Sequence, residues 1–143
     1  MHPTSTMKLT SLSFLLTLAL FVSSAFLAAA ADAGAGAEVK HADAAAAAKL
    51  LKEDPNVIVL DIRTPKEFGE GHLKGAKNVD FNAADFEANL KKLATDKTYL
   101  VNCASGGRST KSLELFKRLG FKSVVHLDGG FKGWEKAGQP VEK

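Results

Sequence analysis

The chain has 143 residues, a formal net charge of +3 and one cysteine. Its 19 Lys and Arg residues against 16 Asp and Glu are too even a balance to indicate a nucleic-acid or membrane-surface partner. A single cysteine excludes an internal disulfide, so packing of the core has to stabilise the fold.

The first 31 residues are predicted to be a cleaved signal peptide. Lys8 gives a weakly positive start, an apolar stretch runs from 12 to 27, and small residues at 28–31 offer an Ala-x-Ala cleavage pattern. Translation can begin at Met1 or at Met7. The alternative is an uncleaved anchor, since the apolar stretch approaches the ~20 residues of a spanning helix. The alanine-rich exit favours cleavage, so we expect a periplasmic or secreted protein without stable membrane insertion.

The remaining residues are enough for one compact domain. Residues 32–37, rich in glycine and alanine, are predicted to be a flexible linker, and 38–143 the folded domain. Short apolar runs and amphipathic helices alternate along this domain. Predicted strands cover 39–41, 57–60, a brief segment at 79, 99–101 and 124–127, and predicted helices start near Asp43, Thr64, Asn82, Thr110 and Phe131. This alternation predicts an α/β fold with a central, mostly parallel sheet of about five strands flanked by helices.

Several helix ends have local signals. Asp43 and Asn82 are suitable N-caps, and the segment 64–67 (Thr-Pro-Lys-Glu) is a capping box with proline at the first helical position. Gly69 and Gly71 are expected to end that helix, and Gly120 is placed to end the one before the last strand.

Cys103 opens a glycine-rich, basic loop, CASGGRS at 103–109, directly after the strand at 99–101. In such a short loop, successive backbone N–H groups can turn toward one point and form an anion-binding nest, and the positive end of the following helix adds to it. Arg108 adds a cation, and residues 97–113 contain no acidic side chain. These surroundings lower the pKa of a cysteine below about 8.5 and favour the nucleophilic thiolate. The alternative, a small buried hydrophobe, fits poorly with two glycines and an arginine as neighbours.

Three segments together resemble the rhodanese family of sulfurtransferases. Residues 59–68 and 70–78 are similar to the early signature of that family, 103–109 to its active-site loop, and 127–134 to its closing turn and helix. The segments occur in the family's order and spacing and span most of the domain.

The resemblance implies a rhodanese-like domain that transfers sulfur through a persulfide on Cys103. The donor is expected to be thiosulfate or a similar small anion, and the acceptor cyanide or a thiol, including a thiol on a protein. Substrate-binding roles are implied for the rest of the loop, namely Ala104, Ser105, Gly106, Gly107 and Arg108. Neither a metal nor an organic cofactor is implied.

The length of the loop distinguishes a sulfurtransferase from related enzymes that act on phosphate or arsenate. Four residues separate Cys103 from Arg108, whereas the related phosphatases and arsenate reductases place five between cysteine and arginine to hold a tetrahedral oxyanion. A cysteine-dependent phosphatase or arsenate reductase is therefore the less favoured enzyme. A non-enzymatic persulfide carrier or docking module remains an alternative, because an intact loop does not distinguish it from an enzyme.

Other polar residues near the motifs are given supporting roles. Asp61 and Arg63 are predicted to form an ion pair or hydrogen-bond network under the loop, and His72 to stabilise its glycine-flanked turn. Gly129-Gly130 is expected to allow close backbone approach beside the loop, and Trp134 with Phe131 is expected to pack in the core.

The remaining polar residues show no catalytic pattern. Ser109 and Thr110 are interpreted as polar groups at the start of a helix. His41 and His126 have no partner pattern, and no Cys/His spacing for zinc is present.

Overall fold

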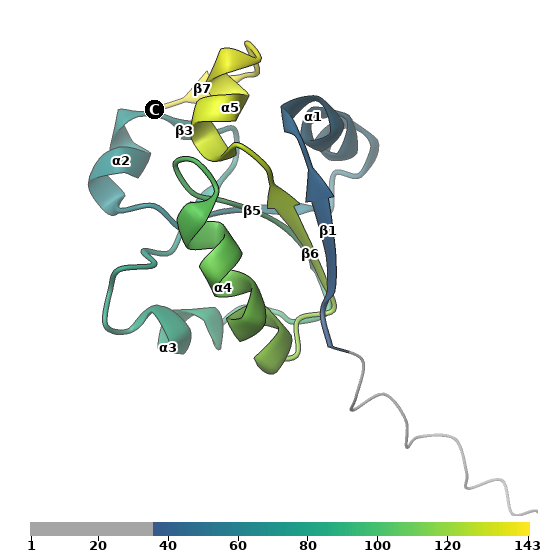
Figure 1. The fold of residues 1–143 in the computed structure, drawn as a ribbon, viewed down its shortest axis with the longest axis vertical. Helices are drawn as coiled ribbons and strands as arrows, with labels where there is room; N and C mark the ends of the chain where they lie inside the picture. Colours follow the sequence, from purple (N-terminus) through teal and green to yellow (C-terminus); the bar gives the residue numbers. More distant parts are fainter. Residues whose placement is uncertain (1–35) are drawn as a thin grey trace, which may run out of the picture. The chain divides into compact units, whose positions relative to one another are not determined.

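The computed structural model describes residues 36–143 (Figure 1). The predicted signal peptide and most of the predicted linker lie outside these residues. Ala37, the last residue of that linker, is buried in the core, so the packed chain begins one residue before the expected boundary. Among the helices of residues 36–143, none has the length and apolar character needed to cross a membrane.

Five strands form one parallel sheet, which confirms the α/β fold class. They are β1 (Glu38–Ala42), β2 (Ile58–Asp61), β4 (Lys77–Asn78), β5 (Thr98–Asn102) and β6 (Ser123–Leu127), in the spatial order β1-β6-β5-β2-β4. The inner strand β5 is buried from Tyr99 to Asn102, as expected for an apolar run covered on both faces. Two further strands, β3 (His72–Leu73) and β7 (Val141–Glu142), pair antiparallel outside this sheet.

Helices cover both faces of the sheet. One core cluster contains Phe86 and Leu90 of α3 (Phe86–Leu90) with Phe116 of α4 (Gly107–Arg118). The other cluster contains residues of α1 (Ala44–Glu53) and α5 (Gly130–Lys136). The fifth helix, α2 (Pro65–Glu70), follows β2. In Figure 1, α3 and α4 accordingly lie together, and α1 and α5 lie on the other side of the strands.

Most of the predicted helix ends are confirmed. Asp43 accepts a hydrogen bond from the Ala46 N–H at 2.8 Å, and both bonds of the capping box between Thr64 and Glu67 are present. Gly120 has a φ of +77° and follows the C-cap of α4. Its N–H bonds to Lys117 O at 3.0 Å, which satisfies a carbonyl of the last turn.

Three helix predictions are wrong in detail. Asn82 does not cap a helix, because its own N–H bonds to Asp80 Oδ1 at 2.9 Å in a turn and α3 starts only at Phe86. The helix after the cysteine loop begins at Gly107 rather than near Thr110. Gly69 lies inside α2, which runs on to Glu70.

The topology brings three loops to one edge of the sheet. Since β2, β5 and β6 are parallel neighbours, their carboxyl ends lie side by side. The loops that start at residues 62, 103 and 128 follow these ends. In open parallel sheets this edge is the usual location of a functional site.

Candidate active site

Cys103 directly follows β5, and the chain then folds back over its sulfur. Gly106 has a φ of +106°, a left-handed conformation that favours glycine, and α4 begins at the next residue, Gly107. This reversal points the Gly106 N–H at the sulfur, with 3.1 Å between N and Sγ. The loop thus places backbone donors around one side chain, which is the arrangement of an anion-binding nest.

Hydrogen bonds decide the ionisation of Cys103. Burial raises the pKa of the thiol. Hydrogen bonds from the Ser109 hydroxyl and from the backbone N–H groups of Ser109, Gly106 and Ser105 act in the opposite direction and hold the pKa below its ordinary value. The Ser109 Oγ lies 3.4 Å from Sγ. The site therefore favours the thiolate.

The sulfur is nevertheless deeply placed. Cys103 is 1 % exposed and belongs to one of the two core clusters. A small buried hydrophobe would have the same exposure, but it would not accept hydrogen bonds from backbone and hydroxyl donors, and apolar surroundings would raise its pKa. The polar contacts therefore favour a reactive site. Because the sulfur is buried, the loop has to move to admit a reactant to it.

Arg108 is not a free cation, contrary to what the local sequence indicates. Its guanidinium donates to both carboxylate oxygens of Glu67, at 2.9 Å to Oε2 and 2.7 Å to Oε1. Glu67 belongs to α2 and lies outside the segment 97–113, so the local sequence around Arg108 gives no sign of it. The Arg108 hydrogen bonds, aided by Thr64, lower the pKa of Glu67 to about 2. The hydrogen bonds to Glu67 are the main cause of the raised pKa of the Arg108 guanidinium, and the negative charge of a Cys103 thiolate adds to them.

Asp61 and Arg63 form a buried ion pair beside the loop. The Arg63 Nη2 atom donates to Asp61 Oδ2 at 2.7 Å and to the Gly71 carbonyl at 2.6 Å. Its guanidinium lies 4.0 Å from the centre of the Phe131 ring, and the Phe131 N–H donates to the Cys103 carbonyl at 2.8 Å. The pair thus contacts the loop through Phe131.

Gly130 lets the first turn of α5 approach the loop closely. It has a φ of +58°, and a Cβ at this position would lie 2.6 Å from Cys103 O and 2.8 Å from the Ala104 carbonyl carbon. The Lys132 N–H donates to Ala104 O at 3.0 Å. The expected close approach of the backbone at Gly129-Gly130 is confirmed.

His72 contacts elements other than the cysteine loop. Its Nδ1 lies 3.0 Å from the Phe68 carbonyl, its ring stacks on the Phe68 ring with centroids 3.8 Å apart, and its Nε2 lies 3.5 Å from Glu142 Oε1. These contacts join α2, β3 and β7. They are consistent with the stabilising role expected for this turn.

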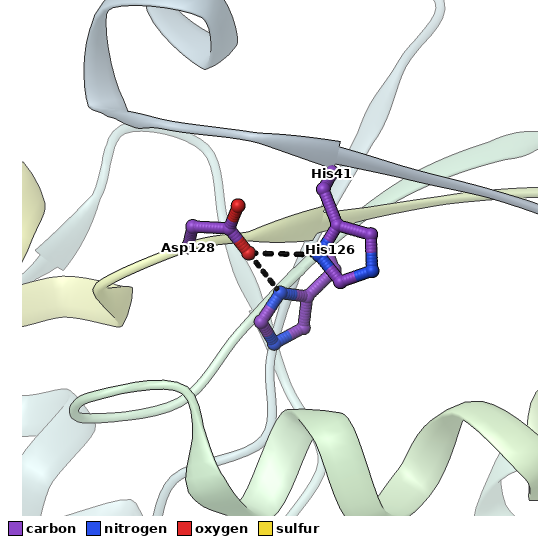
Figure 2. A group of neighbouring side chains, drawn as sticks. All are labelled: His41, His126 and Asp128. Carbon is purple, nitrogen blue, oxygen red and sulfur yellow. Dashed lines mark hydrogen bonds and ion pairs between the residues drawn. The ribbon is translucent and has the colours of Figure 1, made fainter.

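His126 has partners that the sequence did not indicate. Its Nδ1 lies 2.7 Å from Asp128 Oδ1, and the same oxygen lies 2.8 Å from the Nδ1 of His41 on β1 (Figure 2). The Nε2 of His126 lies 2.8 Å from Ser109 Oγ. The prediction that the two histidines lack partners is therefore wrong. The usable signal was the His-x-Asp spacing at the end of the last parallel strand, since residues i and i+2 of a strand face the same side.

The same three side chains carry atoms of the kinds that bind metal ions. One ligand atom from each of His41, His126 and Asp128 lies within 4.8 Å of the others. However, both Nδ1 atoms are at hydrogen-bond distance from the carboxylate oxygen, and a carboxylate only accepts. Both Nδ1 atoms therefore carry protons, and we interpret the group as a hydrogen-bonded cluster.

An open cavity of about 660 Å³ lies elsewhere, against α1 and the start of β2. Leu51, Val57 and Trp134 contribute to its lining, together with Lys52 and Pro140. No residue of the cysteine loop lines it. Its volume exceeds what a small anion needs, and it is separate from the cysteine loop.

The fold and the site together define a class of protein, an α/β domain whose one cysteine accepts hydrogen bonds within a strand-to-helix loop. The family model of the rhodanese-like domain matches residues 43–137, well over half of the chain. The chain belongs to the rhodanese-like domain family.

Relatives and solved structures agree with this assignment. The thiosulfate sulfurtransferase GlpE of Pseudomonas putida is 34% identical over 93 residues, which cover 64% of this chain and 81% of that protein. The probable adenylyltransferase/sulfurtransferase MoeZ of Mycobacterium tuberculosis is 33% identical over 90 residues, 63% of this chain but only 23% of MoeZ. The crystal structure of a rhodanese-related protein from Thermoplasma volcanium matches with a TM-score of 0.64 and 31% identity, over 72% of this chain and 97% of that one.

Proposed function

We propose that this protein is a sulfurtransferase that carries sulfane sulfur as a persulfide on Cys103. The observation that carries the proposal is the set of backbone and hydroxyl donors aimed at Sγ, with the Gly106 N–H at 3.1 Å, which favours a nucleophilic thiolate. Membership of the rhodanese-like family and the sulfurtransferase names of its relatives support the assignment.

The proposed reaction has two halves. The Cys103 thiolate attacks the outer sulfur of thiosulfate, the S–S bond of the donor breaks, and sulfite leaves with the electron pair. Cyanide or an acceptor thiolate then attacks the terminal sulfur of the persulfide, and Cys103 leaves again as the thiolate. Oxidation states balance within each step, so no external oxidant or reductant is needed.

The backbone N–H groups of the loop and the Arg108 side chain have different roles in binding the anion. The N–H groups of Ser105 and Gly106 stabilise charge on the sulfur, and the positive N-terminus of α4 adds to them. Arg108 binds the anionic donor by sharing its guanidinium with Glu67 or by releasing that carboxylate. Such an exchange is feasible because both side chains are partly exposed.

Export is part of the proposal. The segment 1–31 has the positive start, apolar stretch and small-residue exit of a signal peptide. The N-terminal sequence of the protein recovered from the exported fraction of expressing cells tests it. A new N-terminus near residue 32 is expected, whereas full-length chain in the cytosolic fraction would contradict export.

The first test of sulfur transfer is the intact mass of the protein after treatment with thiosulfate. A gain of one sulfur atom is expected, removed again by cyanide, and absent in Cys103→Ser. Because the chain has one cysteine, no other thiol can carry the adduct. A wild-type protein that gains no sulfur would contradict the proposal.

Turnover with thiosulfate and cyanide separates the enzyme from its alternatives. Sustained thiocyanate formation supports the enzyme. A stable persulfide without turnover indicates a carrier for a protein acceptor, and cysteine-dependent hydrolysis of an aryl phosphate without persulfide indicates a phosphatase.

A further inference from the structure

His126 is buried next to the cysteine loop and has no role in the scheme above. It is 3 % exposed and lies on β6. Figure 2 shows its Nδ1 joined to Asp128 and its other ring nitrogen on the side of α4. That nitrogen, Nε2, lies 2.8 Å from Ser109 Oγ, and Ser109 Oγ lies 3.4 Å from Cys103 Sγ. Three contacts thus connect an exposed carboxylate to the sulfur.

The carboxylate fixes the direction of the first contact. Hydrogen bonds from His41 and then from His126 hold the pKa of Asp128 below its ordinary value, although partial burial opposes them. An ionised carboxylate only accepts, so His126 donates from Nδ1. In its neutral form, His126 therefore has a lone pair on Nε2, and this lone pair faces the Ser109 hydroxyl.

Ser109 has one proton and three acceptors within reach. His126 Nε2 is at 2.8 Å, the Gly106 carbonyl at 3.1 Å and Cys103 Sγ at 3.4 Å. With neutral His126, the nearest acceptor is Nε2. When His126 is protonated, Nε2–H donates to Ser109 Oγ, and the Ser109 proton becomes available to the sulfur.

We infer that Cys103, Ser109, His126 and Asp128 form a proton relay that ionises the thiol. The Cys103 S–H bond breaks as its proton moves to Ser109 Oγ, and the former Ser109 proton moves to His126 Nε2. The products are a thiolate and an imidazolium held by Asp128, so the net charge of the group is unchanged and no electrons are exchanged. His126 is thus a positioning residue that accepts the proton through Ser109. The inference rests on the proposed role of Cys103 as the nucleophile.

The groups around His126 are consistent with this relay. Among residues 36–143, the titratable side chains that face it are Asp128 on its own segment, His41 on β1, with ring centroids 5.0 Å apart, and Cys103 across Ser109. The Thr110 hydroxyl at 3.3 Å and the Gly106 carbonyl at 3.4 Å are uncharged. Of the two histidines, only His126 contacts Ser109. His41 shares the carboxylate but has no such contact, which makes it the matched control.

The relay predicts the pH dependence of thiol alkylation. Iodoacetamide reacts with the thiolate, and the single cysteine makes the intact mass an unambiguous readout. Ser109→Ala and His126→Asn are each expected to move the midpoint of the alkylation profile up by about one pH unit, the effect of one hydrogen bond to a charged group. The double variant is expected to show no further shift, because both changes break the same chain. His41→Asn is expected to move the midpoint by less than half as much.

Two amide replacements separate proton transfer from packing. Asparagine at 126 keeps a donor near Asp128 but does not reach Ser109, whereas glutamine reaches Ser109 but cannot take up a proton. The relay predicts that His126→Gln shifts the profile as much as His126→Asn. A wild-type profile in His126→Gln would overturn the relay and leave only a structural contact. If circular dichroism shows that both variants are unfolded, Asp128→Asn replaces them, because Asp128 is half-exposed. The relay predicts that this variant moves the alkylation midpoint to higher pH. An unchanged midpoint would contradict the relay.

The alkylation test does not depend on sulfur transfer. A wild-type protein that forms the persulfide, with an unshifted profile in all relay variants, refutes the relay alone. A shifted profile in a protein that forms no persulfide supports the relay and refutes the proposed sulfurtransferase.

Discussion

Two arginine–carboxylate pairs lie beside the cysteine loop, and they differ in exposure and in partners. In the buried pair, Asp61 and Arg63, the side chains are 0% and 4% exposed. In the loop pair, Glu67 and Arg108, they are 33% and 23% exposed. The buried guanidinium also bonds to the Gly71 carbonyl and lies over an aromatic ring, whereas the loop guanidinium joins α2 to the start of α4.

This difference assigns different tasks to the two arginines. A buried charge cannot release its partner, because the other charge would remain in a medium of low dielectric constant. The partly exposed pair can open at small cost, because water solvates both groups. Arg63 therefore stabilises the fold beside the loop, whereas Arg108 is the cation that turns to the anionic donor in the proposed reaction. Arg63 follows the end of β2 and Arg108 lies in the first turn of α4, and the difference in burial separates their tasks.

The largest loss of stability is expected when the buried pair is broken. Arg63→Met leaves Asp61 buried without its partner and should lower the free energy of unfolding by about 3–5 kcal/mol. The matched variant Arg108→Met should lower it by no more than about 1 kcal/mol. Urea unfolding of both variants at neutral pH measures the difference. Equal losses in the two variants would show that the pairs do not differ in the way their burial indicates.

Gly130→Ala should cause the next largest loss of stability. It crowds the cysteine loop, which the buried pair also contacts through Phe131. A left-handed alanine costs about 1–2 kcal/mol, and crowding against Cys103 O adds about 1–3 kcal/mol. Gly75→Ala is the control, since Gly75 has a φ of +73° but a Cβ there would meet nothing within 4 Å. It should show only the conformational cost. A Gly130→Ala variant as stable as Gly75→Ala would contradict the close approach.

Arg108→Met should affect catalysis rather than stability. Losing a charge-assisted contact to the donor corresponds to a fall of about 10- to 100-fold in kcat/KM for thiosulfate. Arg108→Lys should recover only part of it, because an ammonium group lacks the planar fork of the guanidinium. Steady-state thiocyanate formation measures both variants. If Arg108→Met has the kcat/KM of the wild type, Arg108 is only a link between helices.

Local signals predicted most of the fold. Four of the predicted strands overlap β1, β2, β5 and β6, whereas the brief strand expected at Val79 lies just before it, at Lys77–Asn78 of β4. The Asp43 cap and the capping box at 64–67 were correct because they depend only on neighbours in sequence. The pairing of β3 with β7 was not predicted. Each of these strands has two residues, and their pairing joins His72–Leu73 to Val141–Glu142, far apart in the chain. Such short strands have no periodicity to detect.

Parts of the candidate site could not be found from local patterns. Glu67 already had a local explanation as the last residue of a capping box, and its second contact, with Arg108, spans 41 residues. His126, whose other ring nitrogen contacts Asp128, meets Ser109 only because β6 lies beside β5 in the sheet. The prediction that Cys103 and its loop follow a strand is confirmed, but the contacts that modify the loop come from other elements.

The smallest predicted effect concerns the pH dependence of the loop pair. The pKa of Glu67 is lowered from 4.5 to about 2, chiefly by Arg108, so its ionised form stabilises the folded state. This contribution is fully present above pH 4.5 and is lost as the pH falls toward 2. Because the carboxylate is one-third exposed, solvent screening limits it to about 1 kcal/mol. Glu67→Gln should therefore be less stable than the wild type by about 1 kcal/mol at pH 7 and equally stable near pH 2.

Urea unfolding at a series of pH values measures this difference. Glu70→Gln, an exposed carboxylate on the same helix, controls for the loss of one negative charge. The Glu67→Gln deficit should also vanish at every pH in an Arg108→Met background, because the carboxylate then has no cation to pair with. A deficit that is constant from pH 7 to pH 2 would show that Glu67 acts through the uncharged capping bonds to Thr64. In that case the loop pair would contribute no electrostatic stability, and Arg108 would be free to bind a donor at no cost.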